Sequence, residues 1–236
     1  MRQRYLLMFV LAVVCIASSN LPACADTVAW TDWTSVTPGS PGTGIGTIGS
    51  LSVSYSGQTS ALLHNFPSWT PTTTFSGGIV GNAPPAANNS IQIEGGLPIT
   101  ETITFSSPVV NPIFAIWSLG QGGIPASFNF TASEPFNVLG GGPSAEFGGS
   151  ALTVIGSSVF GREGNGVVQF NGTFTTITFT TPVFENYYAF TVGEDATLTG
   201  GGGGGGSVPE PGTLLLLGLG LSSLPFARRA LVLRRA

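Results

Sequence analysis

Short runs of alternating polar and apolar residues recur through most of the chain, and no long helical pattern interrupts them between Trp30 and Gly193. Gly, Pro, Asn and Ser separate the runs, and these residues typically end strands and form turns. The candidate strands are residues 51–56, 90–93, 101–105, 113–119, 126–131, 151–155, 167–170, 173–179 and 187–192. This pattern predicts an all-β fold, a two-sheet antiparallel β-sandwich of jelly-roll-like type.

The strongest turn signal is Asn171-Gly172, between the runs 167–170 and 173–179. This pair supplies the positive φ angles that a tight type I′ turn needs. We therefore expect residues 167–179 to form a β-hairpin.

One segment recurs at an offset of 74 residues. The sequence ETITFSSPV at 101–109 matches TTITFTTPV at 175–183, and Ala115 falls on Ala189. Each copy is expected to place Ile and Phe on one face and Thr on the other, followed by a turn at proline and an aromatic-rich strand. Either a sandwich uses one strand-turn-strand solution twice, or the segment is duplicated.

Charge distinguishes the body of the chain from its ends. Charged residues make up 8% of the sequence, and six of the seven basic residues, all arginines, lie near the two ends. Between residues 26 and 207, Arg162 alone accompanies ten acidic residues, which gives a net charge of -9. Binding to a phosphate backbone relies on clustered Arg or Lys, so nucleic-acid binding is excluded.

The first 25 residues have the organisation of a secretory signal peptide. Its parts are the basic residues Arg2 and Arg4, an apolar stretch at 5–17, and the small-x-small site Ala23-Cys24-Ala25. This organisation predicts cleavage before Asp26. Cleavage would remove both cysteines, so we expect a mature chain without disulfides.

Two alternatives exist for the N-terminal segment. An uncleaved membrane anchor is disfavoured, because the apolar stretch at 5–17 is too short to cross a bilayer as a helix. Residues 21–24 partly resemble a lipoprotein box, although Pro22 fits that motif poorly.

The C-terminal end has four parts in a fixed order. They are a glycine-rich linker at 200–207, the sequence Val-Pro-Glu-Pro at 208–211, an apolar segment at 213–227, and the basic residues Arg228, Arg229, Arg234 and Arg235. We expect the apolar segment to be a single transmembrane helix in a locally thinned bilayer. Arginines after it favour a cytoplasmic C-terminus, so the exported body at 26–199 would face outward.

Residues 207–236 resemble the PEP-CTERM sorting signal of Gram-negative bacteria that make extracellular polysaccharide. The resemblance rests on Pro209, Glu210 and Pro211, on the Leu/Gly-rich span and on the arginines after it. It implies that a membrane-embedded exosortase recognises the motif, removes the tail and passes the body to the cell surface or matrix. Two departures from the family pattern are Pro225 inside the span and the second arginine pair. The segments 112–120 and 185–193 also resemble parts of the secreted β-domains that precede this signal.

The body offers few groups for catalysis or for metal binding. His64 is the only histidine, and no Gly-x-Ser-x-Gly motif accompanies it. Glu194-Asp195 is the only adjacent acidic pair, and the chain lacks an Asp-x-Asp-x-Asp calcium pattern. We therefore expect a protein that is not an enzyme, with no metal and no cofactor.

Aromatic residues are the candidate contacts to a ligand such as a sugar, provided that they face solvent. The candidates are Trp30, Trp33, Trp69, Tyr187 and Tyr188. Thr-x-Thr patterns at 102/104 and 176/178/180 suggest a flat face that binds ice or a glycan, although outward threonines on ordinary strands explain them as well. We expect a surface or matrix protein associated with extracellular polysaccharide; the alternative is a carbohydrate- or ice-binding module.

Overall fold

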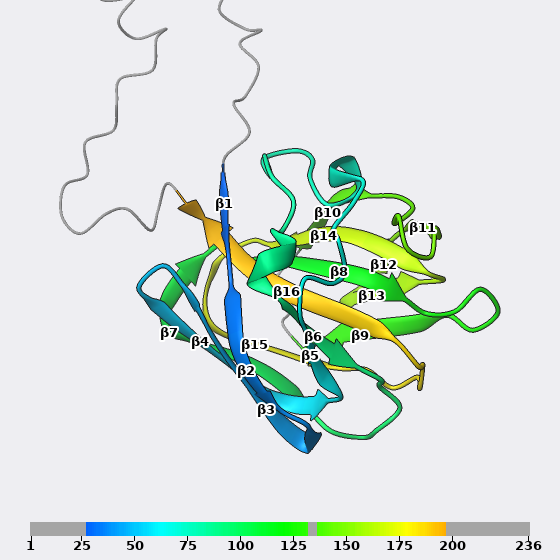
Figure 1. Cartoon of the computed structure of the whole chain (residues 1–236), viewed down its shortest axis with the longest axis horizontal. Coiled ribbons are helices and arrows are strands. Elements are labelled where there is room, and N and C mark those ends of the chain that lie inside the picture. The colour runs from blue at the N-terminus through cyan, green and yellow to red at the C-terminus, as the bar shows by residue number, and fades with distance from the viewer. Residues whose placement is uncertain (1–26, 132–135, 197–236) are drawn as a thin grey trace, which may run out of the picture. The chain divides into compact units, whose positions relative to one another are not determined.

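In the computed structural model, the residues that can be described are 27–131 and 136–196. They form two β-sheets that pack face to face around a shared apolar core (Figure 1). The expected all-β fold with two antiparallel sheets is thereby confirmed. The predicted signal peptide, linker, sorting motif and apolar segment 213–227 lie outside the described residues.

The first sheet has the strand order β10-β14-β8-β16-β6-β5, with β1 paired to β16 and β11 paired to β14. Only the short β11–β14 pairing is parallel. The strands are β1 (Val28–Trp30), β5 (Ala61–Leu63), β6 (Ser90–Ile93), β8 (Ile113–Leu119), β10 (Phe136–Gly141), β11 (Ser150–Ala151), β14 (Gly164–Phe170) and β16 (Tyr188–Asp195).

The second sheet has the order β12-β13-β9-β15-β7-β4-β3-β2. Its strands are β2 (Asp32–Thr37), β3 (Gly39–Ile48), β4 (Leu51–Thr59), β7 (Glu101–Val110), β9 (Ala126–Phe130), β12 (Thr153–Ile155), β13 (Ser158–Gly161) and β15 (Thr173–Thr180). Two single-turn 3-10 helices, η2 (Thr72–Thr74) and η3 (Ala86–Asn88), lie in the long connection between β5 and β6.

Phenylalanine rings from both sheets meet in the core. Phe114 on β8 stacks on Phe190 of its own sheet at 5.0 Å between ring centroids. It also contacts the edges of Phe128 and Phe179 of the second sheet at 5.4 and 5.7 Å. Edge-to-face pairs of this kind stabilise a core beyond the burial of their surface, so these rings join the two layers.

The first sheet is covered on its outer face as well. A second apolar cluster there joins Trp30, Ile113 and Trp117 of the sheet to Trp69 and Phe75 of the connection between β5 and β6. As a result, all seven residues of β8 and all seven of β14 are buried. The second sheet differs, because residues on β4 and β7 alternate between buried and exposed.

The expected hairpin at 167–179 is wrong. β14 pairs with β10 and β8 in the first sheet, whereas β15 pairs with β7 and β9 in the second. Asn171-Gly172 therefore carries the chain from one sheet to the other, held by the Gly172 N–H donating to Asn111 Oδ1 at 2.8 Å. The physical reason is burial, since both faces of β14 are buried, whereas only one face of β15 is.

The two copies of the recurring segment pair with each other. β7 and β15 are antiparallel neighbours, and Ile103 is the register partner of Ile177. β8 and β16 are antiparallel neighbours in the other sheet, with Ile116 opposite Phe190. In both pairs the partners are equivalent positions of the two copies, so a local twofold relation runs through both sheets. The expected turn at proline is wrong for the first copy, because Pro108 lies within β7, whereas Pro182 of the second copy follows β15. One strand-turn-strand unit is used twice, and its duplication stays a prediction.

The two ends of the described body lie side by side. β1 pairs antiparallel with the end of β16, where Val28 is the partner of Asp195. The Ala196 N–H donates to the Thr27 carbonyl oxygen at 2.8 Å. Among the described residues, no helix has the length and apolar character needed to cross a bilayer.

Candidate functional site

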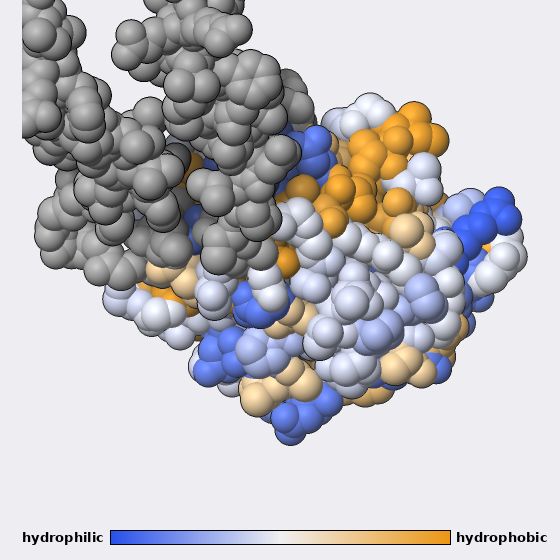
Figure 2. All heavy atoms as spheres, turned by 90° about the horizontal axis from the view of Figure 1, so that it is seen from above, coloured by the Kyte–Doolittle hydropathy of each residue, from blue (hydrophilic) through white to orange (hydrophobic). Residues whose placement is uncertain are grey.

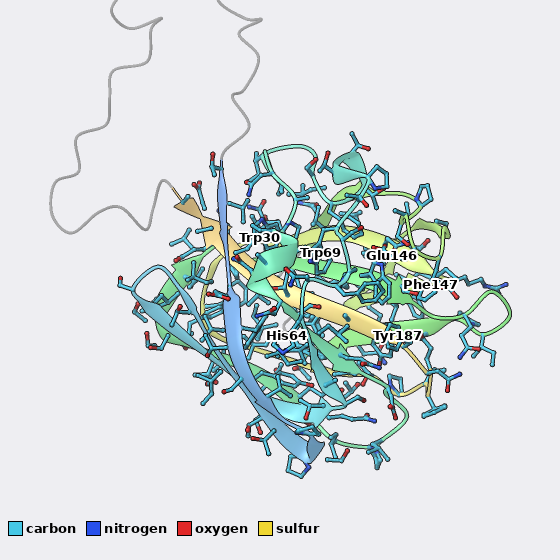
Figure 3. All side chains as sticks on the ribbon, viewed as in Figure 1. Trp30, His64, Trp69, Glu146, Phe147 and Tyr187 are labelled. Carbon is cyan, nitrogen blue, oxygen red and sulfur yellow. The ribbon has the colours of Figure 1, made fainter. Side chains whose placement is uncertain are left out.

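The structure places His64 at the surface of the body. It is exposed just after β5, well apart from Glu146 (Figure 3). Within residues 27–131 and 136–196, no three His, Cys, Asp or Glu side chains are grouped so that they could hold a metal ion.

The most deeply buried acids have structural partners. Glu101 on β7 is fully buried, and its carboxyl is hydrogen-bonded to the hydroxyls of Tyr55 and Thr181. Burial raises the pKa of Glu101 to about 7, although both hydrogen bonds act to lower it. Glu185 accepts hydrogen bonds from the N–H groups of Gly120 and Tyr187. Its pKa is also raised to about 7, chiefly by burial.

Four of the five aromatic residues that the sequence marked for ligand stacking are buried. Trp33 and Tyr188 lie in the core between the sheets, and Trp30 and Trp69 lie in the cluster on the outer face of the first sheet. Large apolar rings are used here to fill the two cores, so four of these expectations are wrong as exposed stacking residues. Tyr187 is half-buried and keeps part of its ring accessible.

Tyr187 belongs to an aromatic patch that sequence reasoning did not find. Phe147, 52% exposed, contacts both Tyr187 and Trp117, at 6.3 and 5.3 Å between ring centroids. The neighbouring Glu146 carboxylate accepts hydrogen bonds from the Ser68 N–H (2.8 Å) and from Trp117 Nε1 (3.1 Å). Burial acts to raise the pKa of Glu146, but these hydrogen bonds outweigh it and lower the pKa. The carboxylate thus holds the exposed Phe147 turn against the sheet.

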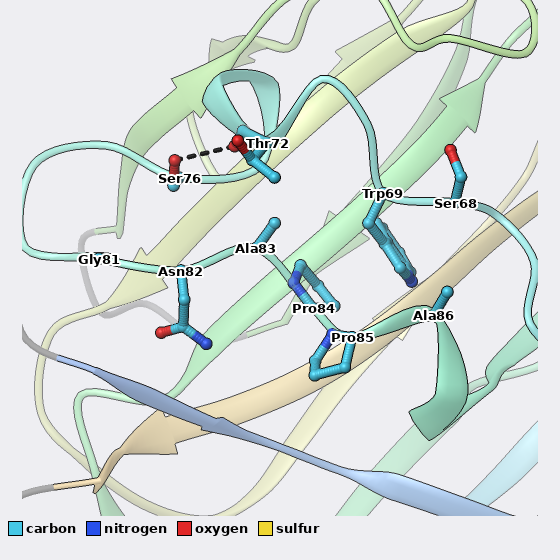
Figure 4. A pocket seen from close by; sticks show the side chains of 10 residues that line it. All are labelled: Ser68, Trp69, Thr72, Ser76, Gly81, Asn82, Ala83, Pro84, Pro85 and Ala86. Atoms are coloured by element: carbon cyan, nitrogen blue, oxygen red, sulfur yellow. Dashed lines mark hydrogen bonds between the residues drawn. The ribbon is translucent and has the colours of Figure 1, made fainter.

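A groove of about 450 Å³ lies on the outer face of the first sheet, within the connection between β5 and β6 (Figure 4). Ser68, Trp69, Thr72 and Ser76 line it together with the segment 81–86. We call it the Trp69 groove. Segment 81–86 contributes Pro84, Pro85 and small residues, so the groove combines apolar surface with hydroxyl groups and carries no charged side chain.

Trp69 differs from the other tryptophans in two respects. Its backbone φ is +53°, in the left-handed region that bulky residues rarely adopt. Its side chain is 1% exposed, and among the described residues its Nε1 has no hydrogen-bond acceptor. The ring packs edge-to-face on Phe75 at 5.0 Å, which fixes its position. The indole ring of Trp69 is therefore fixed in position, and its N–H has no hydrogen-bond acceptor.

The outer face of the second sheet carries a regular array of hydroxyl groups. Thr176 and Thr104 are register partners, and Thr104 is also opposite Ser54. In the next row Thr178 is opposite Thr102, which is opposite Ser56. We call these six residues the hydroxyl face. The expectation that Ile and Phe point inward and Thr outward on both copies is confirmed.

The surface seen from above is not uniformly hydrophilic. Apolar side chains gather in one area of that face, and polar side chains lie around it (Figure 2).

Comparison with known proteins identifies the tail of the chain. Residues 207–235 match the family model described as the PEP-CTERM protein-sorting motif. The chain carries the PEP-CTERM sorting motif. This motif marks proteins that an exosortase sorts to the cell surface, so the chain is exported and associated with the cell envelope. Neither a curated protein nor a solved structure matches the chain.

The PEP-CTERM match begins 11 residues after Ala196, where the described body ends. A chain of that length spans at most about 40 Å.

Proposed function

We propose that this chain is a non-enzymatic surface protein that is held in extracellular polysaccharide after an exosortase has removed its PEP-CTERM tail. The sorting motif at 207–235 is the observation that carries the proposal. The body supports it, because the exposed His64 lies well apart from Glu146 and the buried Glu101 and Glu185 are engaged in structural hydrogen bonds.

The full route has three steps. The signal peptide is cleaved at Ala25, so that the mature chain begins at Asp26. The segment 213–227 crosses the membrane once, with the arginines after it on the cytoplasmic side. The exosortase then recognises Pro209, Glu210 and Pro211 and releases the body. The charge pattern of the two ends supports this orientation.

Intact-mass analysis of the surface fraction tests the route. We expect a chain that begins at Asp26 and lacks residues 228–236. The variant Glu210→Ala should accumulate as the unprocessed membrane form, and the exposed-site variant Asp32→Ala should be processed normally. A surface chain that keeps residues 228–236 in a host with active sorting machinery contradicts the proposal. Association is tested by co-sedimentation of the processed chain with the polysaccharide of its host.

A second candidate function is direct binding of ice or of a glycan by the hydroxyl face. It is supported by the two rows of Ser and Thr on neighbouring strands, an uncharged and regularly spaced surface. Ice-affinity and glycan-array measurements test it. Thr104→Lys, at the centre of the face, should abolish binding, whereas Thr153→Lys on the distant edge strand β12 should not. Equal binding by both variants would exclude the hydroxyl face as the contact.

A further inference from the structure

The Trp69 indole N–H is the one tryptophan donor left without an acceptor in the described part of the chain. Trp30 Nε1 donates to the Asn82 carbonyl oxygen, Trp33 Nε1 to Thr191 Oγ1 and Trp117 Nε1 to Glu146 Oε2, at 3.1 to 3.2 Å. A buried donor without a partner costs free energy, and such groups are rare in folded proteins. Trp69 is a lining residue of the groove, so a ligand oxygen that reaches this buried N–H from the groove would remove the cost.

The backbone at the same residue is strained. A φ of +53° at a tryptophan is unfavourable, and backbone strain of this kind tends to gather at ligand sites. Figure 4 shows the indole ring extending from the backbone toward Ala86, with its nitrogen at that end of the ring. The unusual backbone conformation thus occurs at the residue of the groove wall that carries the unpaired N–H.

From these observations we infer that the Trp69 groove binds a neutral sugar unit of a polysaccharide, whose oxygen accepts a hydrogen bond from Trp69 Nε1. The inference rests on the proposed association with polysaccharide and assigns a site to it. A sugar ring has an apolar C–H face and a rim of hydroxyls. The groove offers both kinds of surface: the exposed ring of Pro85, with Ala83 and Ala86 beside it, and the hydroxyl groups of Ser68 and Thr72.

Charge decides which class of sugar fits. No lining residue of the groove is charged, so a carboxylate or sulfate group would find no cationic partner there. The net charge of -9 on the body adds long-range repulsion against an anionic polymer. A neutral polysaccharide avoids both penalties.

The volume of the Trp69 groove suits one small sugar unit rather than an extended polysaccharide chain. Small-ligand sites commonly measure about 300–1,000 Å³, and the groove holds about 450 Å³. A peptide carbonyl could also accept from Trp69. A polyol suits the groove better, because the Thr72 hydroxyl can donate and accept, and the Ser76 hydroxyl, which donates to the Thr72 carbonyl oxygen, can still accept from a sugar hydroxyl.

The test uses the full exported chain, extracted in a detergent without a sugar headgroup and labelled with ¹⁵N-tryptophan. The sequence holds four tryptophans, so there are four indole N–H signals, and Trp69→Phe assigns the signal of Trp69. Short neutral gluco-, manno- and galacto-oligosaccharides are titrated, with a uronic-acid oligosaccharide and a proline-rich peptide as competing classes. We expect at least one neutral oligosaccharide to move the Trp69 signal while the other three stay in place.

Two variants test the position of the site. Ala86→Leu places a larger side chain in the groove and should weaken binding at least about tenfold. Ala87→Leu is the matched control, because Ala87 is exposed on the same 3-10 helix outside the groove, and it should keep the affinity within about twofold. Trp69→Phe keeps an aromatic ring against Phe75 but removes the N–H, and should also weaken binding about tenfold. The three remaining indole signals report whether each variant is folded.

Three results would overturn the assignment: a Trp69 signal that no neutral oligosaccharide moves, an affinity that Ala86→Leu leaves unchanged, or a stronger response to the uronic acid or the peptide. Co-sedimentation separates this failure from failure of the proposed function. If the Ala86→Leu chain sediments with polysaccharide as the unaltered chain does, the groove is excluded and the proposed function stands. If the unaltered chain does not sediment, the proposed function itself is wrong.

Discussion

The Tyr55 hydroxyl is hydrogen-bonded to the Glu101 carboxyl in the interior of the sandwich, although the two residues lie 46 positions apart. Tyr55 also donates to the Gln58 carbonyl oxygen at 2.9 Å, and Thr181 holds the other carboxyl oxygen of Glu101. Both oxygens of the Glu101 carboxyl have hydrogen-bond partners, which allows this acid to lie in the core. Burial nevertheless raises its pKa.

Stability should fall as the pH rises from about 4.5 to about 7. The pKa of the Glu101 carboxyl is about 7 in the folded chain against its ordinary value of 4.5, so the folded state binds the proton more tightly. The contribution of this tighter proton binding to the free energy of unfolding is fully present below pH 4.5 and is lost as the pH rises through about 7. For Glu101 alone the loss is about 3 kcal/mol, at about 1.4 kcal/mol per pKa unit. Glu185 acts in the same direction.

Thermal unfolding at pH 5 and pH 8 measures this effect, and we expect the higher Tm at pH 5. Glu101→Gln should reduce the difference, because the amide can donate to Tyr55 and accept from Thr181 without titrating. The same pH difference in the variant and in the unaltered chain would show that Glu101 is not its source.

Glu146→Ala should destabilise the chain by about 1 to 3 kcal/mol, because the N–H groups of Ser68 and Trp117 would lose their acceptor. Urea unfolding measures the change, and Asp32→Ala, at an exposed position on β2, is the control. The lowered pKa of Glu146 adds a second expectation. The stabilisation of the folded chain by the ionised Glu146 carboxylate is lost as the pH falls through that lowered pKa. Glu146→Ala should therefore reduce the free energy of unfolding by less in strong acid than at pH 7.

Asn82→Ala should loosen β1 without unfolding the sandwich. The Asn82 side chain accepts from the Val28 N–H at 2.7 Å and donates to the Val28 carbonyl oxygen at 3.0 Å, so it holds this short strand from the side opposite β16. Hydrogen exchange at Val28 and Trp30 should become faster, by a factor corresponding to about 1 to 2 kcal/mol. Asn186→Ala, at an exposed site, should leave both amides protected.

Gly149→Ala should prevent the segment after Phe147 from adopting its native path. The backbone φ of Gly149 is +88°, and an added Cβ would collide with the Glu163 carbonyl oxygen. Gly122→Ala is the matched control, because nothing lies within 4 Å of a Cβ there. Circular dichroism and urea unfolding should show a large loss of stability for the first variant and little change for the second.

The strands with strong β propensity could be predicted from the sequence. Residues 90–93 and 113–119 were expected as strands and form β6 and β8 with the same bounds. β3 was missed, because glycine-rich sequences disfavour strands on propensity alone. Its glycines are needed in the fold, since a Cβ on Gly44 would lie 2.8 Å from Ile91 Cδ1 of the facing sheet. Close approach of two sheets is a tertiary property that local propensity does not report.

The candidate sites, like the strands, include one that local sequence predicts and one that depends on tertiary packing. Outward threonines on β7 and β15 follow from period-two alternation, and the hydroxyl face could be anticipated in part. The Trp69 groove could not, because the connection between β5 and β6 has no regular period. The tryptophan was recognised as a candidate, but its unpaired N–H depends on which groups fold around it.

The pairing of β1 with the end of β16 also has a mechanical consequence. β16 lies inside the first sheet, hydrogen-bonded to β8 and β6, and its last residues are paired with β1. A pulling force applied at Ala196 runs along this interior strand, so the hydrogen bonds to β8 and β1 carry the load together in shear rather than opening one after another. A body tethered through its C-terminal end while its surroundings flow or swell is thus loaded through an interior strand rather than through an edge strand.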